Sequence, residues 1–144
     1  MHRTAMRSLF ILPALLLVSA SQPGADRERA TFGPCGEGKR VTCVVDGDTF
    51  WYRGTKIRIA DINAPEVSHP GCESEAQRGA AATRRLTELL NAGAFSLEVE
   101  GRETDRYGRA LRVVTRNGRS LGTVLEREGL AEHWKGRRGD WCAA

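Results

Sequence analysis

The sequence has no internal repeats, no low-complexity tracts and no long hydrophobic run after residue 20. These absences exclude an array of repeats, a low-complexity linker chain and a protein with several membrane-spanning helices. The one apolar run, from Leu9 to Val18, follows basic residues and is short for a membrane span. With small residues leading to a cleavage point after Ala20, it predicts a signal peptide over residues 1–20, and an uncleaved N-terminal anchor is the alternative. We therefore expect an exported protein, periplasmic or extracellular, with no membrane contact once it is processed.

Strong charge of either sign is also lacking. The expected signal peptide holds two of the 22 basic residues and none of the 18 acidic ones, so the processed chain carries a net charge of about +2. That balance neither requires nor excludes a nucleic-acid partner. Arginine heavily outnumbers lysine, however, and the guanidinium group suits bidentate contacts with phosphate. About 124 residues remain after cleavage, which is the length of one small domain, and we expect a monomer.

Four cysteines follow the expected signal peptide: Cys35, Cys43, Cys72 and Cys142. An even number in a small exported domain predicts two disulfides, with three possible pairings. Cys35 and Cys43 flank a Gly-Glu-Gly turn, which favours their pairing and leaves Cys72 for Cys142. A zinc site that uses His69, Cys72 and Cys142 is the alternative, although its ligand spacing is poor.

Short strands separated by turn signals dominate the rest of the chain. Apolar and polar residues alternate, or β-branched and aromatic residues cluster, in five segments: 41–45, 49–52, 56–62, 95–99 and 110–116. A capping box at Ser74 predicts a helix that stops at 91–93, and Ser120 predicts a second, short helix. We expect an α+β, mainly β domain over residues 35–144, preceded by a flexible lead-in over residues 21–34. Its architecture would be a five-stranded antiparallel barrel of the OB type, with one helix between strands three and four and a short helix after strand five.

One stretch of 21 residues gathers side chains suited to phosphate chemistry. Asp46 and Asp48 are separated by one residue, Arg58 lies on the third expected strand, and Glu66 ends the stretch. Oxygen ligands, an arginine and a further carboxylate suit a divalent cation and a phosphate. Each piece alone has an ordinary explanation, because Asp-Gly is common in turns and Glu66 could form a surface ion pair with Arg58. Together with a charged loop that ends in Arg109, they favour a functional site.

Four motifs in this order resemble the thermonuclease family, typified by staphylococcal nuclease: DGDT at 46–49, NAPE at 63–66, DRYGR at 105–109 and EGLA at 128–131. The resemblance covers about residues 41–131. It implies an OB-type barrel with added helices. It also implies a calcium-dependent endonuclease that hydrolyses phosphodiester bonds of DNA and/or RNA with little sequence preference.

Carried over by position, the resemblance implies one Ca²⁺ ion bound by Asp48, Asn63 and the backbone carbonyl of Ala64. Asn63 stands where the family usually has a second carboxylate, so we expect calcium binding to be weaker rather than lost. Asp61 could compensate for the missing charge only if its strand bulges. Glu66 matches the residue regarded as the general base for the attacking water.

The resemblance also assigns the residues that hold the substrate. Arg58 and Arg109 match the arginines that bind the scissile phosphate, and Arg106 and Tyr107 match residues that help hold the terminal nucleotide. Tyr107 and Trp134 could stack on bases. The alternative function is a catalytically weak or inactive OB-fold module that binds nucleic acid through Arg106, Arg109 and the basic tail over residues 135–138. A third possibility is a structural or cell-surface domain that uses its cysteines for robustness.

Overall fold

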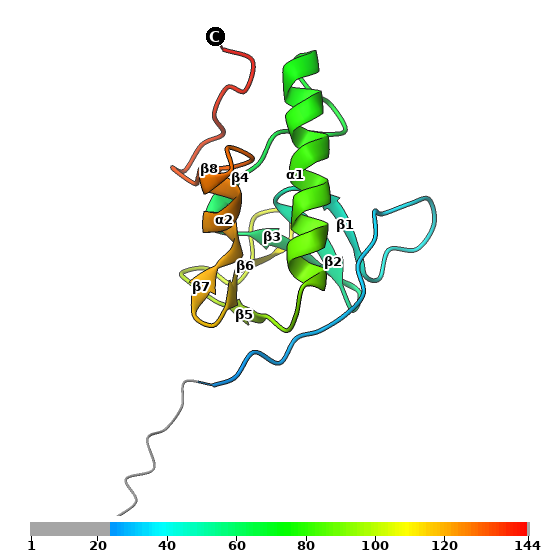
Figure 1. The fold of residues 1–144 in the computed structure, drawn as a ribbon, viewed down its shortest axis with the longest axis vertical. Helices are drawn as coiled ribbons and strands as arrows, with labels where there is room; N and C mark the ends of the chain where they lie inside the picture. Colours follow the sequence, from blue (N-terminus) through cyan, green and yellow to red (C-terminus); the bar gives the residue numbers. More distant parts are fainter. Residues whose placement is uncertain (1–23, 144) are drawn as a thin grey trace, which may run out of the picture.

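The computed structural model describes residues 24–143 (Figure 1). Its elements, in chain order, are β1 (Cys43–Asp46), β2 (Thr49–Tyr52), β3 (Thr55–Ile59), β4 (Ile62–Asn63), α1 (Glu73–Asn91), β5 (Ser96–Glu98), β6 (Ala110–Arg116), β7 (Arg119–Ser120), α2 (Leu121–Arg127) and β8 (Glu132–His133). The expected signal peptide over residues 1–20 lies outside the described residues. Within residues 24–143, neither helix combines the length and the apolar character that a membrane crossing needs.

The main sheet has the strand order β1-β2-β3-β6-β5, with β7 added to β6. The five expected strands and both expected helices are therefore present in the expected order, and the α+β, OB-like fold is confirmed. One pairing differs from the expectation of an antiparallel barrel, because β3 and β6 run parallel, with Arg58 opposite Leu111. A parallel neighbour needs a long crossover connection, and the segment between β3 and β6 supplies one that includes α1.

The third expected strand, over residues 56–62, is interrupted. β3 ends at Ile59, the chain turns at residues 60–61, and β4 then pairs with β8 in a separate two-stranded sheet. The turn is held by Arg58, whose Nη1 donates hydrogen bonds to the carbonyl oxygens of Ile59 and Ile62. The interruption is important for the site because it directs the residues after β3 away from the sheet and toward α1 and α2.

The segment before β1 joins the two ends of the main sheet. Glu28 exchanges two backbone hydrogen bonds with Phe95, just before β5, and the amide of Val44 in β1 donates to the carbonyl of Gly33 at 2.8 Å. Phe32 lies between these contacts, is 4% exposed, and packs among the aromatic rings of the core. The expectation of a flexible lead-in over residues 21–34 is therefore wrong for residues 28–34. Burial of Phe32 and these backbone bonds fasten the segment to the sheet.

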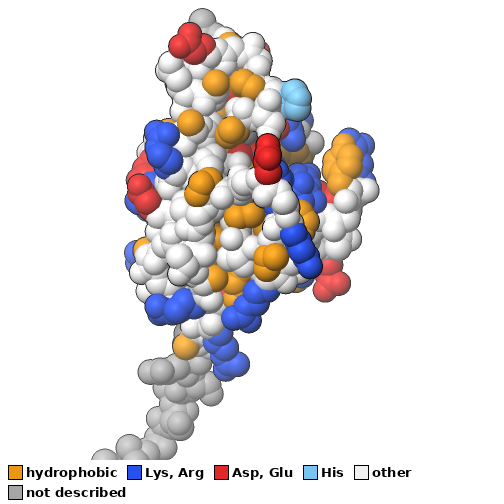
Figure 2. Space-filling model, turned by 90° about the vertical axis from the view of Figure 1, so that its right-hand side faces the viewer, with side chains coloured by type: hydrophobic (Ala, Val, Ile, Leu, Met, Phe, Trp, Pro, Cys, Tyr) orange, Lys and Arg blue, Asp and Glu red, His pale blue; other side chains and the backbone are white. Residues whose placement is uncertain are grey.

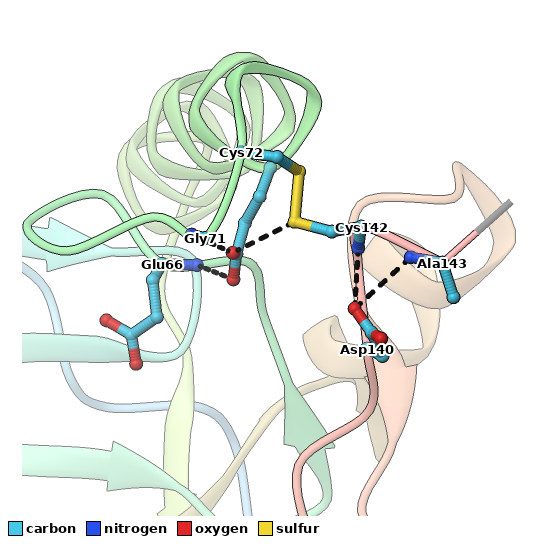
Figure 3. The surroundings of a disulfide bond; sticks show 7 residues. Glu66, Gly71, Cys72, Asp140, Cys142 and Ala143 are labelled. Carbon is cyan, nitrogen blue, oxygen red and sulfur yellow. Dashed lines mark hydrogen bonds between the residues drawn. A yellow bond between two sulfur atoms is a disulfide. The ribbon is translucent and has the colours of Figure 1, made fainter.

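Helix α1 begins one residue before the expected capping box at Ser74. The N-cap residue is Cys72, two residues before Ser74; it forms no side-chain capping hydrogen bond, and its sulfur is in the disulfide with Cys142. The buried carboxylate of Glu75 binds the segment before the helix, accepting hydrogen bonds from the amides of Gly71 at 2.7 Å and Glu66 at 3.2 Å (Figure 3). These bonds fix the loop that carries Glu66 against the first turn of α1.

The other expected helix signals are confirmed. Helix α1 stops at Asn91, and the Ser120 hydroxyl caps α2 by accepting from the amide of Thr123 at 3.3 Å. The core lies between the curved sheet and the two helices, and α1 packs against β1 and α2. Its largest fully buried side chains are Phe50, Phe95, Ile57, Ile59, Ile62, Leu86, Leu90 and Leu125.

Both expected disulfides are confirmed, one between Cys35 and Cys43 and one between Cys72 and Cys142. The zinc alternative is excluded because the two sulfurs that it requires are bonded to each other. The second disulfide links residues 70 positions apart and joins the C-terminal segment to the start of α1 (Figures 1 and 3).

Candidate functional site

The carboxylate of Asp48 connects two of the motifs. Asp48 lies in the turn between β1 and β2 and is 7% exposed. Its Oδ2 accepts a hydrogen bond from the amide of Ala64 at 2.8 Å and forms an ion pair with Nη2 of Arg58 at 3.3 Å. Its Oδ1 accepts from the hydroxyl of Thr49 at 3.0 Å. One buried side chain therefore holds the first turn, the third strand and the segment after β4 together.

Two glycines allow α1 to pack closely against the Asp48 turn and the Glu66 loop. A Cβ atom on Gly47 would lie 2.6 Å from the Cβ of Ala82 in α1 and 2.8 Å from the Cβ of Ala64. A Cβ atom on Gly79 would lie 2.8 Å from the backbone oxygen of Glu66. Both approaches are closer than a side chain tolerates. Helix α1 therefore sets the positions of the Asp48 turn and of the Glu66 loop.

Arg58 is a buried cation with several fixed partners. It is 7% exposed, and its guanidinium lies 5.5 Å from the centre of the Trp134 ring in addition to its contacts with Asp48 and two carbonyl oxygens. Burial lowers the pKa of Arg58, the charge of Asp48 opposes the shift, and the positive charge of Arg109 adds to it. The guanidinium stays charged at neutral pH, since arginine deprotonates far above it. Two arginine charges thus act on the same small region.

The loop before β6 presents Arg109 in a defined orientation. Asp105 accepts from Nε of Arg109 at 2.6 Å, and its other oxygen accepts from the amides of Tyr107 and Arg109, each at 2.9 Å. Although burial raises the pKa of Asp105, these hydrogen bonds lower it overall. Gly108 has a φ of 79°, which a residue with a side chain rarely adopts. Tyr107 is 69% exposed, with the guanidinium groups of Arg106 and Arg109 over its ring.

A cleft of about 730 Å³ lies between these elements. Five of its lining residues are arginines and two are acidic, so it favours an anionic ligand. Arg58 and Arg109, from β3 and from the loop before β6, both line it, together with Arg106, Tyr107 and Trp134. The structure therefore brings together in one cleft four residues that the resemblance assigned to substrate binding.

Glu66 lies at the edge of this cleft. Its amide is held by Glu75, and its carboxylate accepts from Nη1 of Arg138, a residue that lines the cleft. Arg138 belongs to the basic tail, which was expected to bind nucleic acid only in the alternative function. The expected bond between Cys72 and Cys142 was the signal that could have found it, because it brings the C-terminal segment to the loop that follows Glu66.

Asn63 is buried in β4 and paired with a carboxylate that no motif in the sequence marks. Its Nδ2 donates to Oε1 of Glu132 at 3.0 Å, and the two residues are opposite each other in the β4–β8 ladder. Asp61 does not compensate for the missing charge at Asn63. Its carboxylate accepts from the Ser120 hydroxyl at 2.6 Å and faces Gly122 at the start of α2. Glu132 is therefore the acid that contacts the Asn63 amide.

Residues in and beside the Asp48 turn offer the types of oxygen ligand that a hard cation such as Ca²⁺ prefers. Burial, reinforced by the charge of Asp48, raises the pKa of Asp46 to about 7. Two neighbouring carboxylates, the Asn63 amide oxygen and the Ala64 carbonyl belong to the ligand types that calcium prefers. Within residues 24–143 no cluster of three or more His, Cys, Asp or Glu side chains forms a metal site. A cation at this position would therefore rely on amide and backbone oxygen as well as on carboxylates.

The raised pKa of Asp46 has a consequence for stability that can be measured. The pKa of Asp46 in the folded state, about 7, lies above its unfolded value of 3.8. Its contribution to stability is therefore fully present below about pH 4 and is lost as the pH rises through 7. In chelator, Asp46→Asn should be more stable than the parent at pH 8 by up to a few kcal/mol, and no more stable at pH 4. Denaturant unfolding at both pH values measures this. An equal difference in stability between Asp46→Asn and the parent at both pH values would show that the pKa of Asp46 is not raised in the folded state.

Fold and cleft together define a small OB-like domain with an arginine-lined site for an anion. Residues 56–140 match the family described as staphylococcal nuclease homologue, and the chain belongs to that family. Endonuclease YncB of Bacillus subtilis (strain 168) is 37% identical over 92 residues, which are 60% of this chain and 43% of that protein. The SPbeta prophage-derived endonuclease YokF of the same organism is 38% identical over 92 residues, 60% of this chain and 31% of that protein.

A more distant relative matches a longer part of the chain. A Haemophilus influenzae protein named an uncharacterized endonuclease is 27% identical over 127 residues, 87% of this chain and 64% of that protein. The chain thus spans less than two thirds of the length of each of these three relatives.

Proposed function

We propose that this protein is a metal-dependent nuclease that hydrolyses phosphodiester bonds of DNA and/or RNA with little sequence preference. One observation carries the proposal: Arg58 and Arg109 line a single cleft, with Asp48 bonded to Arg58 and Glu66 at the edge. The names of the relatives, which are endonucleases, agree with it.

Arg58 and Arg109 act as a phosphate clamp in this proposal. Hydrolysis of a phosphodiester develops negative charge on the phosphoryl oxygens, and guanidinium groups placed in advance stabilise that charge. Both arginines are held by protein acceptors, Arg58 by Asp48 and carbonyl oxygens and Arg109 by Asp105. Since these contacts already restrict the side chains, little reorganisation is needed when a phosphate enters.

Glu66 acts as the general base that takes a proton from the attacking water. A carboxylate in this role contributes roughly 10²–10⁴-fold to the rate. Its loop is fixed through the Glu75 carboxylate and the close packing of Gly79, so its position does not depend on the substrate. Its side chain is 30% exposed, which leaves it accessible to water.

The resident cation of this proposal is one calcium ion held by Asp48, Asn63 and the carbonyl of Ala64, with Asp46 beside them. When bound, it would supply positive charge and orient the phosphate. Asn63 contributes a neutral oxygen in place of a carboxylate, so we expect weaker binding than a second acid would give.

Little sequence preference follows from the groups that line the cleft. Arginines contact phosphates, and Tyr107 and Trp134 offer aromatic faces on which any base can stack. Arg106 and Tyr107 would hold the terminal nucleotide. Basic side chains also lie over the lower half of the face in Figure 2, and they add to the attraction for nucleic acid.

Export to the periplasm or to the outside of the cell is part of the proposal. Two disulfides within residues 35–142 suit an oxidising compartment. The working form would be a monomer, since one chain contributes all the groups of the site.

The second candidate is a binding module of the same fold with weak or absent catalysis. One observation favours it: the carboxylate of Glu66 is occupied by Arg138, whereas a general base must be free to contact the attacking water. The neutral Asn63 also favours the binding module, because it weakens the binding of calcium. In this case the cleft would bind nucleic acid without cleaving it.

One assay separates the candidates. Purified protein is incubated with plasmid DNA, first with calcium and then with a chelator. We expect degradation that stops on chelation. DNA that stays intact but shifts in a gel would favour the binding module. DNA that neither shifts nor degrades would refute both candidates.

A further inference from the structure

The C-terminal segment after β8 lies along the candidate cleft. Trp134 is over the guanidinium of Arg58, and Gly136 and Arg138 line the same cavity as Arg58 and Arg109. Arg138 donates to the carboxylate of Glu66, 72 residues earlier in the chain. A segment distant in sequence thus places a third guanidinium beside the phosphate clamp and the base.

This segment is fastened at both ends. At one end β8 pairs with β4, and the amide of Gly139 donates back to the carboxylate of Glu132. At the other end Cys142 is bonded to Cys72 at the N-terminus of α1, and Asp140 accepts from the amide of Cys142 at 2.9 Å (Figure 3). The backbone of Arg138 is therefore held, although its side chain is 58% exposed.

The charges in the cleft explain what Arg138 could do there. Its positive charge, like that of Arg109, helps to lower the pKa of Arg58, so the three arginines affect one another. The five arginines of the cleft face the two acids that line it together with Asp48 and Glu66, so one positive charge is left for an incoming phosphate to balance. The pair between Arg138 and Glu66 is partly solvated, and pairs of this kind contribute little free energy. A phosphate can therefore displace Glu66 from it.

We propose that Arg138 is a third phosphate-binding residue, which exchanges the Glu66 carboxylate for a phosphate oxygen when nucleic acid enters the cleft. This inference rests on the proposed nuclease function. The exchange leaves Glu66 without its partner at the moment when a base is needed, so substrate binding and release of the base are coupled. The disulfide between Cys72 and Cys142 keeps Arg138 within reach.

The first test compares Arg138→Ala with Arg84→Ala, a matched control whose side chain is exposed on α1 and does not line the cleft. Binding to a fluorescent single-stranded DNA oligonucleotide is measured in chelator, where the proposed nuclease does not cleave. We expect Arg138→Ala to bind about tenfold more weakly, as loss of a charge-assisted contact predicts. The slope of log K against log salt concentration should fall by about 0.7, the value for one phosphate contact on a single strand. Arg138→Lys should keep the slope and recover part of the affinity.

The second test is a double-mutant cycle with Glu66→Gln. Removing the carboxylate frees Arg138, so Glu66→Gln alone should bind the oligonucleotide several-fold more tightly than the parent. The gain should be smaller when Arg138 is already alanine, because part of it acts through Arg138. An equal gain in both backgrounds would mean that Glu66 only repels the phosphate, and the exchange would be refuted.

The third test removes the tether. The double variant Cys72→Ser with Cys142→Ser should raise KM for DNA cleavage by several-fold, because Arg138 is then held only from β8. Removing Cys35 and Cys43 in the same way is the control and should leave KM unchanged. Circular dichroism at the assay temperature confirms that both variants are folded.

The outcomes separate this inference from the function on which it rests. If the parent cleaves DNA and Arg138→Ala behaves like Arg84→Ala in affinity and salt slope, only the role of Arg138 fails. If the parent binds without cleaving and Arg138→Ala weakens binding as expected, the nuclease function fails and the phosphate contact stands. A parent that neither binds nor cleaves DNA would overturn both.

Discussion

Replacing Glu66 by glutamine should lower kcat by about 10²–10⁴-fold, the range expected for loss of a general base. The carboxamide has nearly the same shape as the carboxylate, but it cannot accept a proton from water at neutral pH. The Glu66 amide keeps its hydrogen bond to Glu75, so the loop should keep its position. KM should not rise, because the substitution removes a negative charge from the neighbourhood of the phosphate. Steady-state cleavage of DNA in calcium measures both constants.

The matched control for this substitution is Glu73→Gln. Glu73 is an exposed acid in the first turn of α1, close in sequence to the same loop but outside the cleft. Its replacement should leave kcat within about twofold of the parent, as surface changes usually do. Thermal unfolding should show both variants folded at the assay temperature. If Glu66→Gln cleaves DNA as fast as the parent, another group takes the proton and the base assignment is wrong.

Replacing Arg109 by alanine should lower kcat/KM by about 10²–10³-fold, the loss seen when one preorganised donor to a developing charge is removed. Arg109 reaches the cleft from the loop before β6, and its Nε is occupied by Asp105, which sets the direction of the guanidinium. The rest of the fold does not depend on it to the same degree as on the buried Arg58. The comparison of kcat/KM values therefore reports on phosphate binding in the transition state rather than on folding.

Two further variants test whether geometry or charge matters at this position. Arg109→Lys keeps the charge but lacks the planar fork, so it should recover only part of the lost kcat/KM. Arg84→Ala removes one positive charge from the exposed face of α1, outside the cleft, and should have little effect at moderate salt. Equal losses in Arg84→Ala and Arg109→Ala would show that the net charge of the protein, and not a contact in the cleft, governs the rate.

The local features of the sequence predicted the fold well. Alternating strands, the stop at Asn91, the Ser120 cap and the pairing of the four cysteines were confirmed, since each depends on residues near in the chain or on a small number of combinations. The N-cap expected at Ser74 was wrong by two residues: the N-cap is Cys72, and Glu75 binds amides of the segment before the helix. The burial of Phe32 was missed because a short polar stretch carries no strand or helix pattern.

The motifs also predicted which residues would gather at the site. Asp48, Arg58 and Arg109 belong to three segments whose order matched a family, and the structure joins the first two by an ion pair and the last two in one cleft. The parallel pairing of β3 and β6 was not predicted, because strand direction depends on the path of the long connection between them.

The sequence by itself determined the kinds of groups at the site, namely carboxylates, an amide and arginines, and it determined which cysteines could bond. Only the tertiary structure decided how these groups are paired. Asp61 faces Ser120 in place of the candidate metal ligands, and Glu66 meets Arg138 across 72 residues. The reason is physical: a local pattern specifies a backbone conformation, whereas the partner of a charged side chain depends on which distant segment the packing of α1 and the Cys72–Cys142 bond bring beside it.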